Sequence, residues 1–303
     1  MVHMTRLTLI NLMMALVAMT FFAANSVLCR MALAESDIDP ASFTSIRLVS
    51  GALVLYVLSY IFHSRNSDSP KCALVQQPME HWLAAAMLFL YAATFSFAYM
   101  YLETGIGALI LFAFVQLTMF AYSHHKEGGA SGLEYIGALI AVAGLGYMVS
   151  PGMNAPDAWG AGLMAISGVA WGIYSVLGKE MKVPQLPANC INFRLSIFFV
   201  VPFFLLNIPM NTVSSEGIWL AVLSGAGASA IGYAIWYGVV QQFKATQAGV
   251  MQLSVPIIAA LAGYMLLDET LTLRMVISAA VILFGITVTF LGKENKQSSL
   301  ARD

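Results

Sequence analysis

The stretch FKATQAGVMQLSVPIIAALAGYMLLDETLT, residues 243–272, decides the fold of this chain. No residue between Lys244 and Asp268 carries a formal charge. At about 1.5 Å of rise per residue, a helix of this length crosses a hydrocarbon layer of about 30 Å. Gly249, Gln252 and Pro256 fall at helical spacing, so a small residue, an amide and a helix-bending proline share one face. We therefore predict a transmembrane helix whose polar face looks inward.

Composition excludes a soluble domain. The chain is 59% hydrophobic and 10% charged, where soluble proteins carry roughly 25% charged residues. Its net charge of -1 provides no basic face for nucleic acid, so we expect no nucleic-acid partner. Cys29, Cys72 and Cys190 fit neither an even-numbered disulfide framework nor metal-ligand spacing, and we expect free thiols. No nucleophile, phosphate-loop or metal motif occurs, so no cofactor, metal or enzymatic activity is expected.

Apolar runs separated by charged or turn-rich breaks predict an all-α polytopic membrane protein with ten transmembrane helices. The first run is too long for a signal peptide, so we expect it to be retained. The predicted spans are 7–29, 42–62, 82–102, 104–123, 133–150, 158–178, 191–210, 217–240, 246–267 and 273–292.

The second half of the chain repeats short sequences of the first half in the same order. Ser26-Val27-Leu28 recurs as Ser175-Val176-Leu177, and Arg47-Leu48 recurs as Arg194-Leu195. We therefore predict a first five-helix repeat at 1–150, a second at 151–292 and a cytoplasmic tail at 293–303. Because each repeat has an odd number of helices, the two must be inverted relative to each other.

The distribution of Lys and Arg predicts the orientation in the membrane, since cytoplasmic segments carry an excess of both. With the N-terminus inside, only Arg30 and Arg274 fall at the outer edges. Both termini are therefore expected in the cytoplasm. The cytoplasmic segments hold Arg6, Arg65, Lys71, Lys126, Lys179, Lys182, Lys244, Lys293, Lys296 and Arg302.

A small-residue pair, an apolar run ending in Pro256 and then Glu269-Thr270-Leu271-Thr272 resemble the EamA family of the drug/metabolite transporter superfamily. The first repeat departs from this pattern, with Val115 and Gln116 where the second has Pro256 and Ile257. The resemblance implies a secondary transporter of the cell inner (plasma) membrane that works by alternating access. It also implies export of a small metabolite, and a cavity formed by helices of both repeats.

Polar and aromatic residues in the middle of the predicted spans are candidates for that cavity, because inverted-repeat transporters bind their substrates near the midplane. Such a lining suits a small amphiphilic solute. Packing between helices is the alternative role for each of them. The candidate substrate-binding residues are Phe22, Asn25, Phe112, Gln116, Trp171, Tyr174, Tyr233, Trp236, Tyr237 and Gln252.

Arg47 and Arg194 are the only basic residues well inside predicted spans. Each lies a few residues from its helix start, so we expect a snorkelling or phosphate-contacting side chain, with recognition of a substrate carboxylate as the alternative. Carboxylates fall in loops, tails or end turns, so none is placed to bind a proton or a cationic drug at the midplane.

We therefore expect export of an amino acid or related amphiphile, with a small-molecule substrate and membrane lipid as partners. An importer of the same solute and a multidrug exporter are the alternatives within the transporter class. A membrane enzyme and a passive channel or scaffold are the alternatives outside it. The sequence leaves the choice between monomer and homodimer open.

Overall fold

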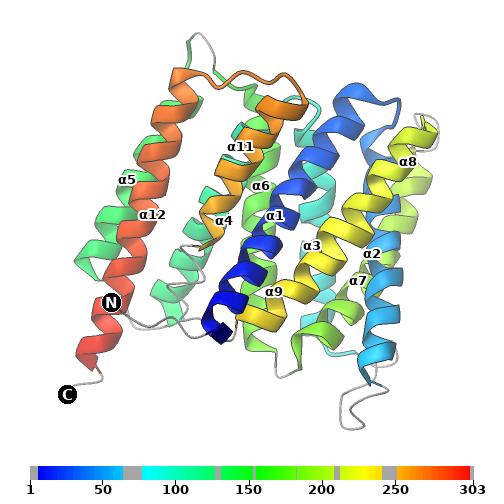
Figure 1. Ribbon diagram of the computed structural model, residues 1–303, viewed down its shortest axis with the longest axis horizontal. Helices are drawn as coiled ribbons and strands as arrows, with labels where there is room; N and C mark the ends of the chain where they lie inside the picture. The colour runs from blue at the N-terminus through cyan, green and yellow to red at the C-terminus, as the bar shows by residue number, and fades with distance from the viewer. Residues whose placement is uncertain are drawn as a thin grey trace.

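The computed structural model describes residues 6–63, 77–126, 131–152, 155–181, 183–207, 212–240 and 251–300, and Figure 1 shows their arrangement. Apart from one bridge between Ile38 and Val213, the regular structure of these residues is helical. The helices are α1 (Arg6–Glu35), α2 (Pro40–His63), α3 (Met79–Ala98), α4 (Thr104–Lys126), α5 (Gly132–Val149), α6 (Ala158–Glu180), α7 (Gln185–Asn207), α8 (Ser215–Val222), η2 (Leu223–Ile231), α9 (Gly232–Val240), α11 (Ser254–Leu266) and α12 (Leu273–Leu300).

Within the described residues, 9 helices are long and apolar enough to cross a membrane, with α8, η2 and the start of α9 forming one of them. These helices match the predicted spans to within a few residues. The predicted span at 246–267 differs, because its described part holds a turn at Leu253 followed by the shorter α11. Pro256 therefore lies in the first turn of α11, where a missing backbone N–H costs little, and does not bend a continuous helix there. Gly249 lies outside the described residues.

Side chains of the connections determine where several helices begin. Ser131 and Glu134 form a capping box at α5, with bonds of 2.7 and 3.3 Å. Asp157 accepts the Gly160 N–H at α6 (2.7 Å), and Ser214 accepts the Gly217 N–H at α8 (3.0 Å). Such caps provide partners for backbone N–H groups that the first helical turn leaves free.

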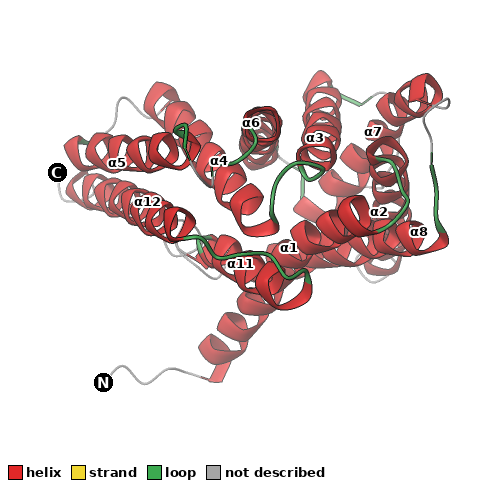
Figure 2. Cartoon of the chain, turned by 90° about the horizontal axis from the view of Figure 1, so that it is seen from above, coloured by secondary structure: helices red, strands yellow, loops and turns green. Residues whose placement is uncertain are grey.

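The helices form two layers when viewed from above (Figure 2). Along much of the molecule, α5, α4, α6 and α3 lie on one side, and α12, α11 and α1 lie on the other. The most extensive contact between described helices is that of α5 with α12, which lie side by side in Figures 1 and 2. A Cβ at Gly285 of α12 would lie 2.5 Å from the Ala141 nitrogen and 2.6 Å from the Gly137 oxygen. Small residues therefore allow these two backbones to approach closely, as in other membrane helix pairs.

The helix that begins as α8 widens to a π-helix in its small-residue segment η2, LSGAGASAI. A Cβ at Gly225 would lie 2.0 Å from the backbone oxygen of Arg47, so only glycine allows η2 to approach α2 this closely. This small-residue run therefore serves as a packing surface at Gly225. Single-turn π geometry often marks functional sites in helices.

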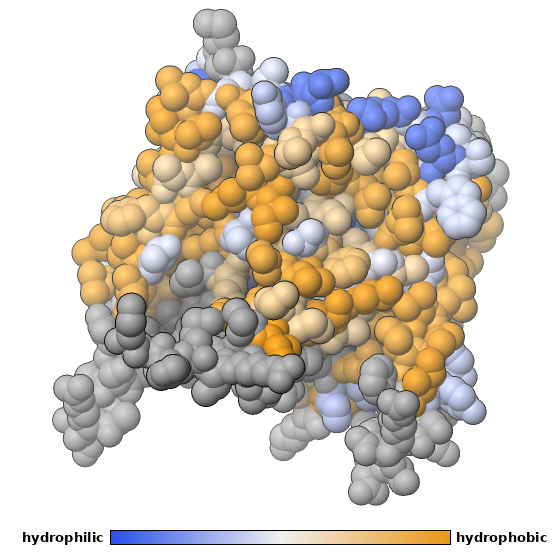
Figure 3. All heavy atoms as spheres, in the orientation of Figure 1, coloured by the Kyte–Doolittle hydropathy of each residue, from blue (hydrophilic) through white to orange (hydrophobic). Residues whose placement is uncertain are grey.

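The molecular surface is apolar around its flanks. In Figure 3 hydrophobic side chains cover the visible helices, and hydrophilic ones gather at the upper edge. Leu139, Leu206 and Phe284 are examples of large apolar side chains that face outward. The start of α1 and the end of α12 lie at the same end of the molecule (Figure 1). This is the surface of a multi-pass membrane protein.

Candidate functional site

An aromatic cluster joins helices from both halves of the chain at the centre of the bundle. Trp171 of α6 packs against Tyr91 of α3 (4.8 Å between ring centroids), against Tyr174 (5.2 Å) and against Tyr233 of α9 (5.2 Å). Phe22 of α1 contacts Tyr233 at 5.6 Å and Trp236 at 6.2 Å. We call Phe22, Tyr91, Trp171, Tyr174, Tyr233 and Trp236 the central aromatic cluster.

A chain of buried hydrogen bonds runs along one side of this cluster. Ser224 of η2 donates to the Asn25 side-chain oxygen (2.6 Å), and the Asn25 amide donates to the Tyr91 hydroxyl (3.2 Å). Asn25 is 6% exposed and Ser224 is fully buried, so both depend on these bonds in an apolar interior. The chain ties α1, α3 and η2 together beside the aromatic rings.

Arg47 of α2 ends the same chain, because its Nη2 donates to the Tyr91 hydroxyl at 2.9 Å. Its guanidinium carbon lies 5.1 Å from the centroid of Tyr91 and 4.9 Å from that of Phe95. The Nε and Nη1 atoms have no hydrogen-bond partner within the described part of the chain. The expectation that this side chain snorkels to the surface is therefore wrong, since Arg47 is only 2% exposed.

Burying the charge of Arg47 without an anionic partner costs free energy. Each aromatic face stabilises a neighbouring cation by about 0.5–2 kcal/mol. Desolvation of a buried unpaired ion costs several kcal/mol. Tyr91 and Phe95 therefore offset only part of the cost of burying Arg47, and an anion beside the guanidinium would stabilise it. Arg194, its counterpart in the sequence repeat, is partly exposed and lies 5.0 Å over Tyr56 of α2.

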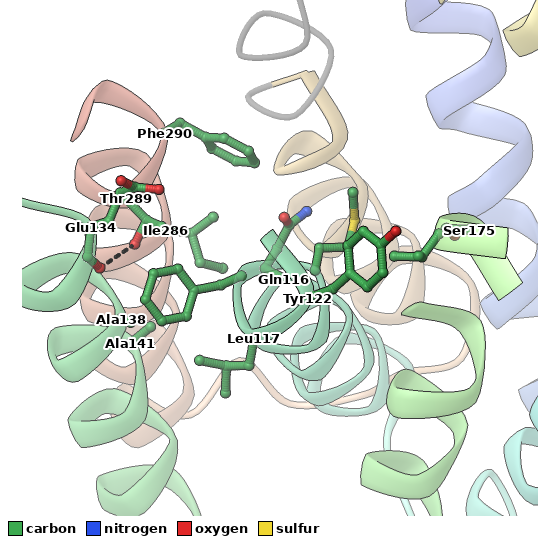
Figure 4. Close-up of a pocket in the computed structure, with 13 residues that line it drawn as sticks. Gln116, Leu117, Tyr122, Glu134, Ala138, Ala141, Ser175, Ile286, Thr289 and Phe290 are labelled. Atoms are coloured by element: carbon green, nitrogen blue, oxygen red, sulfur yellow. Dashed lines mark hydrogen bonds between the residues drawn. The ribbon is translucent and has the colours of Figure 1, made fainter. Parts of the chain in front are cut away.

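A cavity of about 100 Å³ lies between the later turns of α4, the first turns of α5 and the ends of α6 and α12. Figure 4 shows its labelled side chains, with Glu134 of α5 on one side and Ser175 of α6 on the other. Gln116, Glu134, Ser175 and Thr289 are its polar lining residues, and the rest is largely apolar. Glu134 is 5% exposed and its carboxylate caps α5, so it does not present a free charge to the cavity.

The structure brings most of the predicted site residues together. Phe22, Asn25, Trp171, Tyr174, Tyr233 and Trp236 meet in or beside the central aromatic cluster. Gln116 lines the cavity, and Phe112 is buried one turn before it on α4. Gln252 is half-buried just before α11. The side chain of Tyr237 lies outside the described residues.

A second polar group lies at the end of the molecule where α11 is followed by α12. Both carboxylate oxygens of Glu269 accept the backbone N–H of Thr104 at 2.8 Å, and one also accepts its hydroxyl at 2.9 Å. Arg30 of α1 approaches the same carboxylate at 3.5 Å and donates to the Tyr99 carbonyl oxygen at 2.7 Å. Glu269 thereby caps α4 and ties it to α1.

The expectation about the cysteines needs correction. Cys190 is disulfide-bonded, so the expectation of three free thiols is wrong; Cys29 is free and buried, and Cys72 lies outside the described residues. The number of cysteines does not reveal which of them meet in the folded chain. No grouping of His, Cys, Asp and Glu fit to hold a metal occurs among the described residues.

Three contributors to the site were not among the candidate substrate-binding residues, although Arg47 had recognition of a carboxylate as its alternative role. Tyr91 receives hydrogen bonds from Asn25 and Arg47, and Ser224 completes the chain. Arg47 carried a usable signal, because a cation deep in an apolar run is costly unless it has a function. Tyr91 also carried a signal, because it forms an aromatic face with Phe95 and Tyr99 at helical spacing, whereas Ser224 lies in a small-residue run that indicates packing.

Comparison with known proteins identifies the family. Residues 158–291 match the EamA-like transporter family. The chain is 40% identical to an uncharacterized protein of Pseudomonas aeruginosa over 92% of this chain and 93% of that one. It is 24% identical to an uncharacterized transporter of Archaeoglobus fulgidus, over 92% of this chain and 96% of that one.

The fold also occurs in a solved structure. A crystal structure of a protein 19% identical to this chain matches it with a TM-score of 0.63, over 93% of this chain and 98% of that one. An uncharacterized transporter of Bacillus subtilis, YoaV, is 20% identical over 84% of this chain and 89% of its own. The sequence matches and the helical membrane fold agree, and the chain belongs to the EamA-like transporter family.

Proposed function

We propose that this membrane transporter moves a small amphiphilic metabolite by alternating access, with the central aromatic cluster as its substrate site. The observation that carries the proposal is the meeting of Phe22 and Tyr91 from the first half with Trp171 and Tyr233 from the second. A site shared by two halves is exposed to one side or the other when the halves rock against each other.

The helix contacts support two inverted five-helix repeats. α6 packs on α3, and its counterpart α1 packs on the helix formed by α8, η2 and α9. α4 contacts α6, and its counterpart α11 contacts α1. Helices at equivalent positions also contact each other, as α2 contacts α7 and α5 contacts α12. A pseudo-two-fold axis that relates the two repeats would give each of these contacts a counterpart in the other repeat.

The lining favours a solute with an apolar body and few polar groups, such as an amino acid or a related amphiphile. Indole and phenol rings provide broad apolar faces, and Asn25 provides an amide for orientation. Export across the inner membrane is the direction that the family resemblance favours. The direction is tested by loading the solute on one side at a time.

Counterflow in proteoliposomes tests the proposal. Radiolabelled amino acids, amines, nucleosides and sugars are offered to vesicles loaded with the same unlabelled solute. We expect one solute class to exchange, and Trp171→Ala to reduce its flux about tenfold or more, because Trp171 contacts three other rings of the site. Trp236→Ala is expected to reduce it as well.

Trp159→Ala is the matched control, because this residue is on the same helix as Trp171 but is 67% exposed. It should leave the flux unchanged. Absence of exchange for every solute in folded protein contradicts the proposal. Equal flux in Trp171→Ala, Trp236→Ala and the parent protein places the substrate site elsewhere.

A further inference from the structure

Arg47 carries a positive charge that has no anionic partner in the described structure. Its Nε and Nη1 atoms are unpartnered among the described residues, and Nη2 donates to the Tyr91 hydroxyl, which carries no charge to balance it. A guanidinium keeps its charge in proteins, so burial cannot neutralise it. The undescribed stretch 241–250 contains no Asp or Glu that could pair with it.

The place of Arg47 in the bundle puts its guanidinium beside the central aromatic cluster. Its guanidinium lies 5.1 Å from the Tyr91 ring centroid, and Tyr91 lies 4.8 Å from Trp171, again between ring centroids. η2 also touches the backbone of Arg47 at Gly225, so movement of this helix changes the surroundings of the guanidinium. The positive charge is therefore adjacent to the central aromatic cluster, and it is buried in this conformation.

Resting on the proposed function, we propose that the transported solute carries a carboxylate and that Arg47 binds it. One edge of the guanidinium donates to the carboxylate oxygens, through Nε–H or Nη1–H together with one N–H of Nη2, while the other N–H of Nη2 stays on the Tyr91 hydroxyl. The apolar body of the solute lies on Trp171 and Tyr233. The substrate class is an organic carboxylate with an apolar body, with or without an amino group.

The absence of a midplane carboxylate agrees with this class. The acidic residues lie in loops, tails or helix ends, so the described centre holds a cation without a balancing anion. A cationic solute would be repelled by Arg47, and an uncharged one would leave its charge unpaired. An anionic group on the solute completes the site.

The test compares carboxylates with their amides. Thermal unfolding of the purified protein is followed with 3-phenylpropionate, leucine, and the corresponding amides as probes. At least one carboxylate should raise the melting temperature while its amide does not. A preference for 3-phenylpropionate over leucine identifies a simple acid, and the reverse identifies an amino acid.

Arg47→Met should lower the affinity for that carboxylate on the order of a hundredfold, because a charge-assisted pair is lost. Arg47→Lys should retain part of it, and Arg194→Met should retain all of it. In the absence of ligand, Arg47→Met should unfold at the same or a higher temperature than the parent, since an unpaired buried charge has been removed.

Several results overturn the proposal. They are equal stabilisation by acid and amide, no stabilisation by any carboxylate, an unchanged preference in Arg47→Met, or a ligand-free Arg47→Met that unfolds at a lower temperature or does not fold. Exchange of an uncharged solute by both parent and Arg47→Met would retain the transport function and reject the carboxylate. Absence of exchange for every solute would reject the transport function itself.

Discussion

At the scale of single residues, Glu269 ties two helices together through one carboxylate. Its oxygens accept the Thr104 N–H at 2.8 Å and lie 3.5 Å from the Arg30 guanidinium. Glu269→Gln removes the charge from both contacts, and we expect a loss of about 1–3 kcal/mol in unfolding free energy. Chemical or thermal unfolding in detergent measures it. Asp268→Asn is the control, because Asp268 is exposed and Asn tolerates its backbone conformation at φ 49°. This variant should change the unfolding free energy little. Equal losses in both variants would contradict the role of Glu269 as a tie between helices.

Glu103 gives the same region a pH dependence. Burial, and then the negative charge of Glu269, raise the pKa of Glu103 above its usual value. The native state therefore holds this proton more tightly than the unfolded chain, and stability falls as pH rises from about 4.3 through the raised native pKa.

Glu103→Gln makes the side chain permanently neutral. Its melting temperature should exceed that of the parent at pH 7 and approach it near pH 4, where both side chains are uncharged. The effect should stay below about 1 kcal/mol, because solvent screens a half-buried carboxyl. A difference that does not change with pH, or that has the opposite sign, would show that burial does not govern this carboxyl.

At the scale of helices, α5 and α12 approach so closely that backbone meets backbone. A Cβ at Gly285 would lie 2.5 Å from the Ala141 nitrogen, which cannot move away as a side-chain end could. Gly285→Ala should therefore cost about 1–3 kcal/mol through overpacking. Gly146→Ala on α5 meets nothing within 4 Å and should be neutral or stabilise by about 0.5–1 kcal/mol. Thermal unfolding of both variants distinguishes close packing from general glycine effects, which would affect both alike.

Helix positions were largely predictable from the sequence, and irregular backbone was not. Apolar runs give the spans because every backbone group in lipid must be paired within a helix. The turn at Leu253 and the widening at η2 leave no mark in hydropathy. Both depend on how neighbouring helices approach, as Gly225 does at the Arg47 backbone.

The site was predicted in part for a similar reason. Aromatic and amide residues in the middle of a span, such as Trp171 and Asn25, can be recognised as site candidates because they are unusual in apolar runs. The position of Arg47 near a helix start suggested a route to the surface, but the described structure encloses its guanidinium between Tyr91 and Phe95. Sequence distance from a helix end does not give depth when neighbouring helices cover that end.

At the scale of the whole molecule, the excess of Lys and Arg in alternate connections predicts both termini in the cytoplasm. Alkaline phosphatase fused after residue 152 should be active, because the connection between the halves is expected outside. The same enzyme fused after residue 303 should be inactive, and a fluorescent protein there should fluoresce. Reversed activities would place the termini on the outer side.

The contacts of Glu269 make the two ends of the molecule unlike. Gln116, at the cavity, lies about 18 Å along α4 from Thr104, in surroundings that are mostly apolar. If the two ends open in turn, opening at Glu269 breaks several charge-assisted hydrogen bonds, whereas opening at the cavity breaks the bond from the Tyr122 hydroxyl to Glu180 and otherwise separates mainly apolar side chains. Opening at the Glu269 end then has the larger activation enthalpy. During transport, cooling should slow opening at the Glu269 end more than opening at the cavity end and leave most molecules closed at the Glu269 end.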